Sequence, residues 1–329
     1  MLPVLVVVAG GRLGEFQWDL DAPTGVFKNN ALSTKLREAA IAQAKFMQFV
    51  DPEPGYGRKK GDTVTISRVR NIAEATTGVF AETDRVPIDT FAMSTTSITV
   101  KYFGRGVEYT EKTELLAHFD VADKIQRKLR SQMELILDTA ASAAFKTAKI
   151  TYAPTSLSAG TFETGGACTT TALQNVTVSH IKVLRDYMTD TIHVPGWRGS
   201  DQYICLASTK ALRGIKNDPE FLAWRMYNKP DEAFFKGEVG MIENVKFIEV
   251  NHTNALSNSK GSGSVLGEMV VFGDDAVAMA VVEDPELRAA IPGNFGLSHA
   301  VAWIGLLNFG IIWDTANDGE ARVIYVTSA

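Results

Sequence analysis

Apolar side chains recur every three or four positions along residues 121–147, the strongest periodic pattern in the sequence. This spacing places them on one face of an α-helix and leaves the charged side chains on the other. Asp120 stands where a helix N-cap is expected. At 1.5 Å per residue the helix would be roughly 40 Å long, which suits a structural strut. The predicted buried stripe includes Ile125, Leu129, Met133 and Ile136, and the predicted solvated face includes Lys124, Arg127, Lys128, Arg130, Glu134 and Asp138.

Two shorter stretches, 63–67 and 96–102, alternate polar with apolar residues, as half-buried β-strands do. The segment between them is rich in Thr, Ala and charged residues. A connection this long is uncommon in a compact domain and tends to be functional. The segment is too polar to pack on its own subunit, so we expect its charges to meet opposite charges on a neighbour. These predicted contact residues are Arg70, Glu74, Glu82, Asp84, Arg85 and Asp89.

The remaining pattern is mixed helix and strand. A helix expected over 33–50 ends at the Pro and Gly residues of 52–55, and residues 151–176 show little periodicity, which predicts a loop. Asp318-Gly319 between two apolar stretches predicts a β-hairpin. The other expected helices are 178–188, 209–216 and 220–227, and the other expected strands are 203–207, 245–250, 265–272, 276–282, 306–313 and 322–326.

Composition is that of an ordinary globular protein: 329 residues, 45% hydrophobic and 22% charged, with length for about two domains. The net charge of −5 and the single dense cationic run at 58–60 do not fit a protein that grips nucleic acid specifically. The two cysteines, Cys168 and Cys205, are far apart, which excludes a disulfide framework and fits a reducing cytoplasm. No apolar run is long enough for a membrane span, so none is expected.

Several short motifs imitate active sites and lack a required part. Residues 6–14 resemble a dinucleotide-binding strand and turn, but no helical period follows before Pro23, which favours an extended arm over an oxidoreductase. The five histidines show no metal-ligand spacing. Adjacent carboxylates at 274–275 and 283–286 favour solvated turns. The sequence therefore predicts no catalytic residue, no cofactor and no metal site.

Five stretches, in their order and spacing, carry a family resemblance: 61–66, 102–110, 217–221, 235–240 and 245–247. From about residue 30 to the end, the sequence resembles the Hong Kong 97 fold of tailed-phage major capsid proteins, in particular the branch named after the short-tailed phage N-four. The resemblance implies an α+β fold with five parts. These are an N-terminal arm at 1–57, an extended loop at 58–104, a peripheral domain at 105–169 with its spine helix, an axial domain at 170–294, and a peripheral return at 295–329.

The same resemblance implies a structural subunit that assembles into pentamers and hexamers of an icosahedral shell around double-stranded DNA. The implied partners are further copies of the chain, a separate scaffolding protein and a portal protein, with a decoration protein left open. DNA contact would be non-specific, and the subunit would belong to a virion assembled in the host cytoplasm. Residues 71–93 contain no lysine, so we expect no covalent crosslink there. A bacterial nanocompartment shell of the same fold remains an alternative.

Overall fold

A computed structural model describes the chain except for residues 1–41, 54–55, 73–77, 83–84, 118, 223–237 and 257–266. By its internal contacts the chain divides into two units, Met1–Ile41 and Ala42–Ala329, and every described residue belongs to the second. Residues 1–41 of the predicted arm, the first half of the helix expected over 33–50 and part of the helix expected over 220–227 therefore lie outside the described residues. In the second half of 33–50 only a 3-10 turn forms, at Phe46–Phe49, so the α-helix expected there is wrong.

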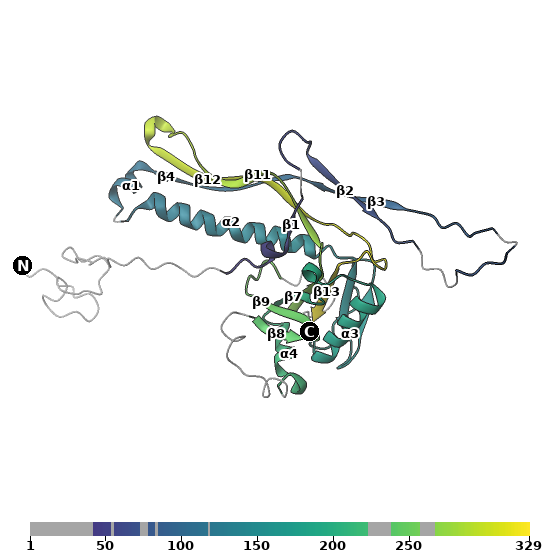
Figure 1. Ribbon diagram of the computed structural model, residues 1–329. Coiled ribbons are helices and arrows are strands. Elements are labelled where there is room, and N and C mark those ends of the chain that lie inside the picture. The colour runs from purple at the N-terminus through teal and green to yellow at the C-terminus, as the bar shows by residue number, and fades with distance from the viewer. Residues whose placement is uncertain are drawn as a thin grey trace, which may run out of the picture. The chain divides into compact units, whose positions relative to one another are not determined.

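The described elements are labelled in Figure 1. In chain order they are η2 (Phe46–Phe49), β1 (Asp51–Pro52), β2 (Thr63–Val69), β3 (Met93–Thr99), β4 (Lys101–Thr110), α1 (Glu111–Leu116), α2 (Val121–Phe145), β5 (Ile150–Pro154), β6 (Gly160–Glu163), α3 (Val178–Asp186), η3 (Tyr187–Thr191), η4 (Trp197–Gly199), β7 (Tyr203–Ser208), α4 (Leu212–Asn217), β8 (Glu238–Ile242), β9 (Val245–Val250), β10 (Gly267–Phe272), β11 (Val277–Ala289), η5 (Asn294–Gly296), β12 (Ser298–Ile311) and β13 (Val323–Ser328).

Two sheets and one ribbon organise these strands. A four-stranded sheet has the order β1-β11-β12-β4, and α2 lies along it, as Figure 1 shows. A seven-stranded sheet has the order β6-β5-β13-β10-β7-β9-β8, and β2 and β3 form a separate two-stranded ribbon. The sheets do not follow the predicted domain boundaries. Strand β11, within the predicted axial domain, belongs to the sheet of β4 and β12, whereas β5 and β13, within the predicted peripheral parts, belong to the seven-stranded sheet.

The seven-stranded sheet is covered on both faces. Met269 and Val271 of β10 belong to the core that contains Ile181 and Leu184 of α3. Val270 and Phe272, which alternate with them, belong to the core that contains the C-terminal half of α2. All six residues of β10 are buried for this reason, as is usual for a strand packed between two layers.

Helix α2 confirms the helix predicted from the periodic pattern. It begins at Val121, after Asp120, whose carboxylate accepts a hydrogen bond from the backbone N–H of Asp123 at 3.0 Å. That bond satisfies one of the amide groups that a helix N-terminus leaves without an intrahelical partner. Exposed Asp123 also pairs with Arg127 one turn later, at 3.1 Å.

Asp138 does not lie on a solvated face, contrary to the prediction, because its side chain is fully buried. Its Oδ1 accepts hydrogen bonds from the backbone N–H groups of Lys45 and Phe46, at 2.8 and 2.7 Å, and a longer one from Met47. Its Oδ2 lies 3.1 Å from Nδ1 of His252. The last two turns of α2 are enclosed by other segments, so Asp138 and Ser142 no longer face water.

The prediction of a loop over 151–176 is wrong in its first part, since β5 and β6 form there. All five residues of β5 are buried, and the strand lies between β13 and β6. The polar sequence of this region did not indicate a buried strand, because β13 is distant in sequence. After β6, the Glu163 carboxylate accepts hydrogen bonds from the backbone and side chains of Thr169 and Thr170. Because these bonds favour the charged form, they lower the pKa of Glu163 to about 2.

The hairpin predicted at Asp318-Gly319 is also wrong. The turn exists, but β12 pairs with β11 and β4, whereas β13 inserts between β5 and β10. The turn is held by other contacts. The Gly319 N–H donates to the Ile192 carbonyl at 3.0 Å, and Oδ1 of Asp318 lies 2.6 Å from Nδ1 of His193. Two strands close in sequence thus belong to different sheets.

The carboxylates at 283–286 lie inside strand β11, not in a turn. The pairing of β11 with β12 shifts register on both sides of Glu283, which marks a β-bulge. Glu283 pairs with Arg288 at 2.6 Å and with Arg58 at 3.3 Å. The sequence resembled a turn because Pro285 and three acids are unusual in a strand.

The Asp138 contacts predict a large cost for Asp138→Ala. The substitution leaves backbone N–H groups of residues 45–47 buried without an acceptor, so the free energy of unfolding should fall by on the order of 3 kcal/mol. Urea unfolding followed by circular dichroism measures it. Asp123→Ala, in the exposed first turn of the same helix, should cost less than about 1 kcal/mol. Equal losses in the two variants would show that the Asp138 contacts do not stabilise the fold.

Candidate assembly surfaces

The root of the β2–β3 ribbon is docked on its own chain. Ile98 is 3% exposed and packs with Ala278, Ala280 and Ile312. The approach is so close that a Cβ atom on Gly310 would lie 2.7 Å from the Ile98 side chain. The absence of a side chain at Gly310 therefore permits the ribbon to lie against β12.

Arginines reinforce the same docking. Arg68 is buried, with its guanidinium 5.7 Å from the ring centre of Trp313, and Arg322 approaches that ring at 4.9 Å. Both distances suit cation–π attraction. Burial lowers the pKa of Arg322. Next along β2, Arg70 pairs with buried Glu320 at 3.3 Å, which fixes the point where the ribbon leaves the core.

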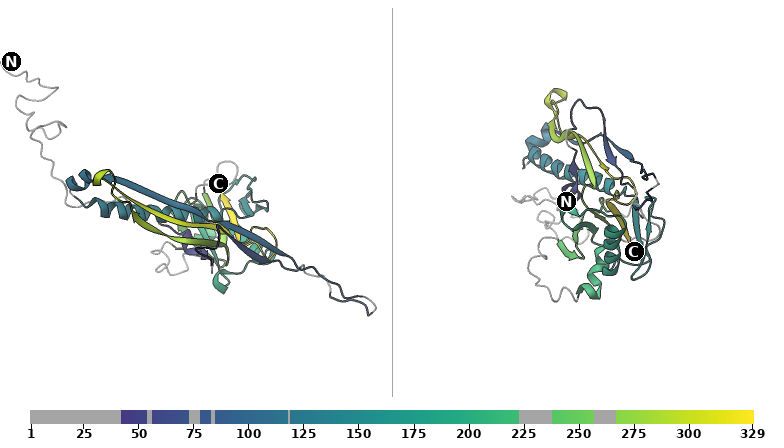
Figure 2. Two further views of the ribbon diagram at one scale, coloured as in Figure 1. Left: turned by 90° about the horizontal axis from the view of Figure 1, so that it is seen from above. Right: turned by 45° about the vertical axis from the view of Figure 1, so that its right-hand side comes forward.

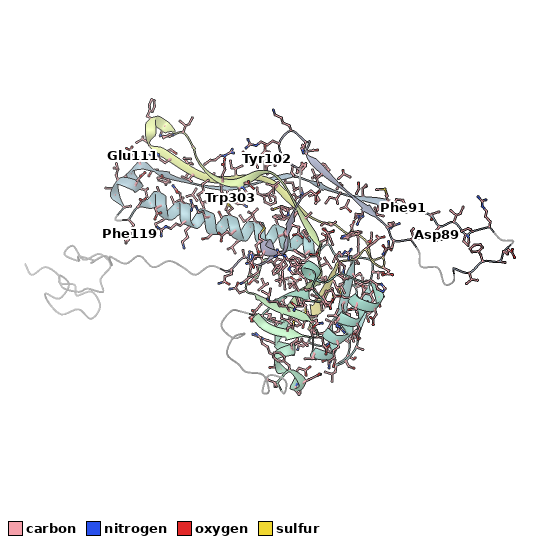
Figure 3. The ribbon with its side chains drawn as sticks, viewed as in Figure 1. Asp89, Phe91, Tyr102, Glu111, Phe119 and Trp303 are labelled. Atoms are coloured by element: carbon pink, nitrogen blue, oxygen red, sulfur yellow. The ribbon has the colours of Figure 1, made fainter. Side chains whose placement is uncertain are left out.

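The segment from Val69 to Met93, called the excursion from here on, exposes apolar side chains, which the sequence-based description of a polar segment missed. Val79 is 89% exposed, Ile88 is 76% and Phe91 is 64%. Figure 3 shows Phe91 and Asp89 on this excursion, away from both sheets. Exposed apolar groups in this number mark an interaction surface. We call this set the excursion surface; it comprises Val69, Ile72, Val79, Phe80, Val86, Ile88, Phe91 and Met93.

The predicted contact residues fall into three groups. Arg70 binds Glu320 of its own chain and is not available to a neighbour in this structure. Glu82, Arg85 and Asp89 are exposed on the excursion. Glu74 and Asp84 lie outside the described residues.

A second apolar surface lies at the opposite end of the four-stranded sheet, where Figures 1 and 2 place α1 beside the β11–β12 turn. The Glu111 N–H donates to the Leu297 carbonyl at 3.0 Å and ties the two together. No sequence motif indicated this surface, because its members come from two distant segments. We call it the tip surface; it comprises Leu115, Leu116, Ile291, Phe295 and Leu297, all exposed.

Between these ends, the predicted spine stripe of α2 faces β12. Leu129 is buried with Val301 and Trp303. Ile125, Met133 and Ile136 are partly buried against the same cluster. These contacts fix the helix along the sheet that carries both ends.

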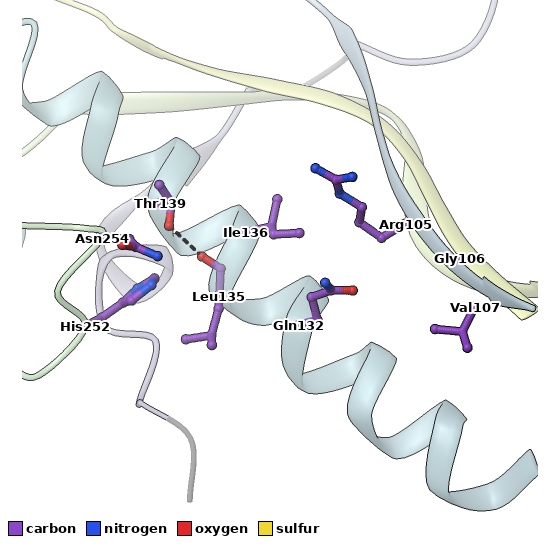
Figure 4. Close-up of a pocket in the computed structure, with 9 residues that line it drawn as sticks. All are labelled: Arg105, Gly106, Val107, Gln132, Leu135, Ile136, Thr139, His252 and Asn254. Carbon is purple, nitrogen blue, oxygen red and sulfur yellow. Dashed lines mark hydrogen bonds between the residues drawn. The ribbon is translucent and has the colours of Figure 1, made fainter. Parts of the chain in front are cut away.

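A pocket of about 520 Å³ opens between β4, the middle of α2 and the loop after β9 (Figure 4). Arg105 is its exposed cation, and no carboxylate lines it. Apart from the resemblance of residues 102–110, no sequence pattern indicated this pocket, because its walls come from segments that are distant in sequence. The lining residues are Arg105, Gly106, Val107, Gln132, Leu135, Ile136, Thr139, His252 and Asn254.

Groups suited to metal or redox chemistry are not assembled in the described part of the chain. It contains no cluster of three or more His, Cys, Asp or Glu side chains arranged to hold a metal ion. Cys168 and Cys205 are buried and separate, and burial raises the pKa of the Cys205 thiol. Among the described helices, none combines the length and apolar character needed to cross a membrane. The nucleotide-like motif at 6–14 lies outside the described residues.

Comparison with solved structures gives matches over nearly the whole chain. The capsid of Ralstonia phage GP4 matches with a TM-score of 0.65 at 16% identity, covering 94% of this chain and 97% of that one. The capsid of cyanophage Pam1 gives 0.70 at 13% identity, covering 94% and 99%. The capsid of cyanophage P-SCSP1u gives 0.64 at 13%, covering 98% and 99%. The chain has the fold of phage capsid proteins.

This capsid fold confirms the predicted α+β class and architecture. No protein-family model matches the sequence, and no curated protein matches it. At 13–16% identity the similarity lies in the fold, whereas the sequence resemblance rested on the order and spacing of five stretches.

The tight contact at Gly310 predicts that Gly310→Ala loosens the ribbon. The new Cβ would collide with Ile98, at a cost of about 2 kcal/mol. Amide hydrogen exchange in β2 and β3 should accelerate while α3 stays protected. Adding Ile98→Ala removes the colliding atoms, so the two substitutions should not be additive. Gly78→Ala is the control, since nothing lies within 4 Å of its Cβ position. Equal exchange rates in the Gly310→Ala and Gly78→Ala variants would mean that the ribbon is not held at Gly310.

Proposed function

We propose that the chain is the major capsid protein of a tailed bacteriophage, a non-enzymatic subunit that forms pentamers and hexamers of a closed icosahedral shell around double-stranded DNA. The observation that carries this proposal is the excursion, which has a fixed root and an exposed apolar surface. The fold shared with several phage capsids supports it.

The excursion surface requires a partner outside the chain that carries it. A two-stranded ribbon is marginally stable alone, and exposed Ile88 and Phe91 gain from being removed from water. A contact between an excursion and a different surface of a neighbour is heterologous, and such contacts close into rings when the rotation allows. The tip surface, at the other end of the four-stranded sheet, provides a second contact for joining rings.

The predicted parts find natural roles in such a shell. The four-stranded sheet with α2 would form most of the peripheral domain, and the seven-stranded sheet with α3 would form the axial domain. Residues 58–104 would be the extended loop and residues 1–57 the arm. A separate scaffolding protein and a portal protein would be partners, and a decoration protein an optional one. The net charge of −5 would keep contact with packaged DNA weak and non-specific.

Removing the excursion tests the proposal. Replacing residues 72–92 by a short Gly-containing turn should leave a folded subunit, because the contacts of Ile98, Arg68 and Arg70 lie outside the deletion. Shell formation should be lost, since every copy loses all of the excursion surface except Val69 and Met93. Circular dichroism reports folding and negative-stain electron microscopy reports assembly. Arg85→Ala is the matched point change and should assemble normally, because one exposed charge contributes at most about 1 kcal/mol.

Closed shells from the shortened chain would show that the excursion is not the interlocking element. A full-length chain that stays monomeric with and without a scaffolding partner would contradict the shell function itself.

Mature particles should be held by non-covalent contacts. The excursion lacks lysine between residues 71 and 93, and both cysteines are buried. A denaturing gel of purified particles should therefore show one band at the 35.8 kDa of the chain. Covalent ladders that persist with a reducing agent would contradict this expectation.

A further inference from the structure

The pocket beside α2 combines a cation with a lining that is mainly polar and partly apolar. Val107, Leu135 and Ile136 supply apolar surface, and Arg105 stands on the β4 wall (Figure 4). Its remaining polar lining is Gln132, Thr139, Asn254 and His252, whose Nδ1 lies 3.1 Å from Oδ2 of buried Asp138. A volume of about 520 Å³ accommodates several side chains of an inserted segment.

Several arginines of the described chain are paired within the subunit, and Arg105 is not. Arg58, Arg70 and Arg288 each pair with a carboxylate of the same chain. Arg105 is exposed, forms no ion pair with any described residue and has no acid among its pocket neighbours. Covering it with an apolar surface alone would desolvate an unpaired charge, which is costly. The pocket therefore suits an occupant that carries a carboxylate beside apolar side chains.

Residues 85–92 of the excursion have that composition. They have no strand partner and are exposed throughout. Asp89 stands between Ile88 and Phe91, two of the most exposed apolar residues of the excursion surface, and Figure 3 shows it clear of the body of the chain. Glu82, the other described acid of the distal excursion, lies in a turn beside Ala81. Asp89 is thus the acid whose surroundings match the pocket.

The segment and the pocket of one chain cannot meet. The root of the ribbon is fixed at Ile98 and Arg68, and from there Figures 1 and 2 show the ribbon leading away from α2. We propose that residues 85–92 of one copy dock in the pocket of a second copy, with Asp89 facing Arg105. This contact rests on the proposed shell function and specifies where the excursion binds. It joins two different surfaces, so it propagates around a ring.

Charge reversal tests the pairing. Asp89→Arg and Arg105→Asp each place like charges together, and each should reduce the yield of closed particles at least about tenfold. The double variant restores opposite charges and should return the yield to within about threefold of the unchanged chain. Sedimentation and negative-stain electron microscopy measure the yield. Circular dichroism and thermal melting should be unchanged, because both residues are exposed.

A mixing experiment decides whether the contact is between copies. Asp89→Arg and Arg105→Asp subunits, each unable to associate alone, should associate when mixed, because the altered segment of one fits the altered pocket of the other. The matched control is a double variant that carries Arg105→Asp and Glu82→Arg in the same chain, and it should not assemble. Rescue by that control would show that any added cation suffices and would overturn the pairing.

The remaining outcomes separate this inference from the proposed function. Normal particles from both single variants, or a double variant that stays unassembled when both singles fail, would overturn the docking while the shell function stands. A full-length unchanged chain that never forms particles would instead contradict the proposed function. Folding loss in a single variant would show that its residue supports the subunit itself and would overturn its role as an exposed contact.

Discussion

Helix α2 is shared by two hydrophobic cores, and the arrangement of the subunit depends on that sharing. Leu129 in its N-terminal half packs on Trp303 of the four-stranded sheet. Leu137 and Phe145 in its C-terminal half pack with Phe272 of the seven-stranded sheet. One continuous helix thus packs on both sheets.

Local pattern predicted the elements whose environment is local. The stripe from Ile125 to Ile136 identified α2, because a helix repeats its burial every turn. The periodic pattern could not show burial by segments that are distant in sequence. Asp138 was therefore predicted to be solvated, although the backbone at Phe46 covers it. The pairing of strand β13 was wrongly predicted for the same reason, since pairing with β5 and β10 depends on segments distant in sequence. Such errors concern partners more than element types.

The residues of the candidate surfaces also divide into those that the sequence indicated and those that it did not. Charged residues such as Arg85 and Asp89 drew attention to the excursion, because a long polar connection is unusual. The apolar members, such as Ile88 and Phe91, were missed because a scattered apolar residue in a loop has no period to reveal it. Arg105 was missed because its pocket exists only once β4, α2 and the loop after β9 are brought together.

The carboxylate of Asp138 holds residues 45–47 through their main-chain N–H groups and makes no use of their side chains. Any residue other than proline offers the same donor. These hydrogen bonds therefore place no requirement on the side chains at 45–47, and the identity of Phe46 is set separately by its buried packing against Phe145. Main-chain contacts of this kind constrain the sequence little. Proteins that share a fold held in this way can therefore have very low sequence identity.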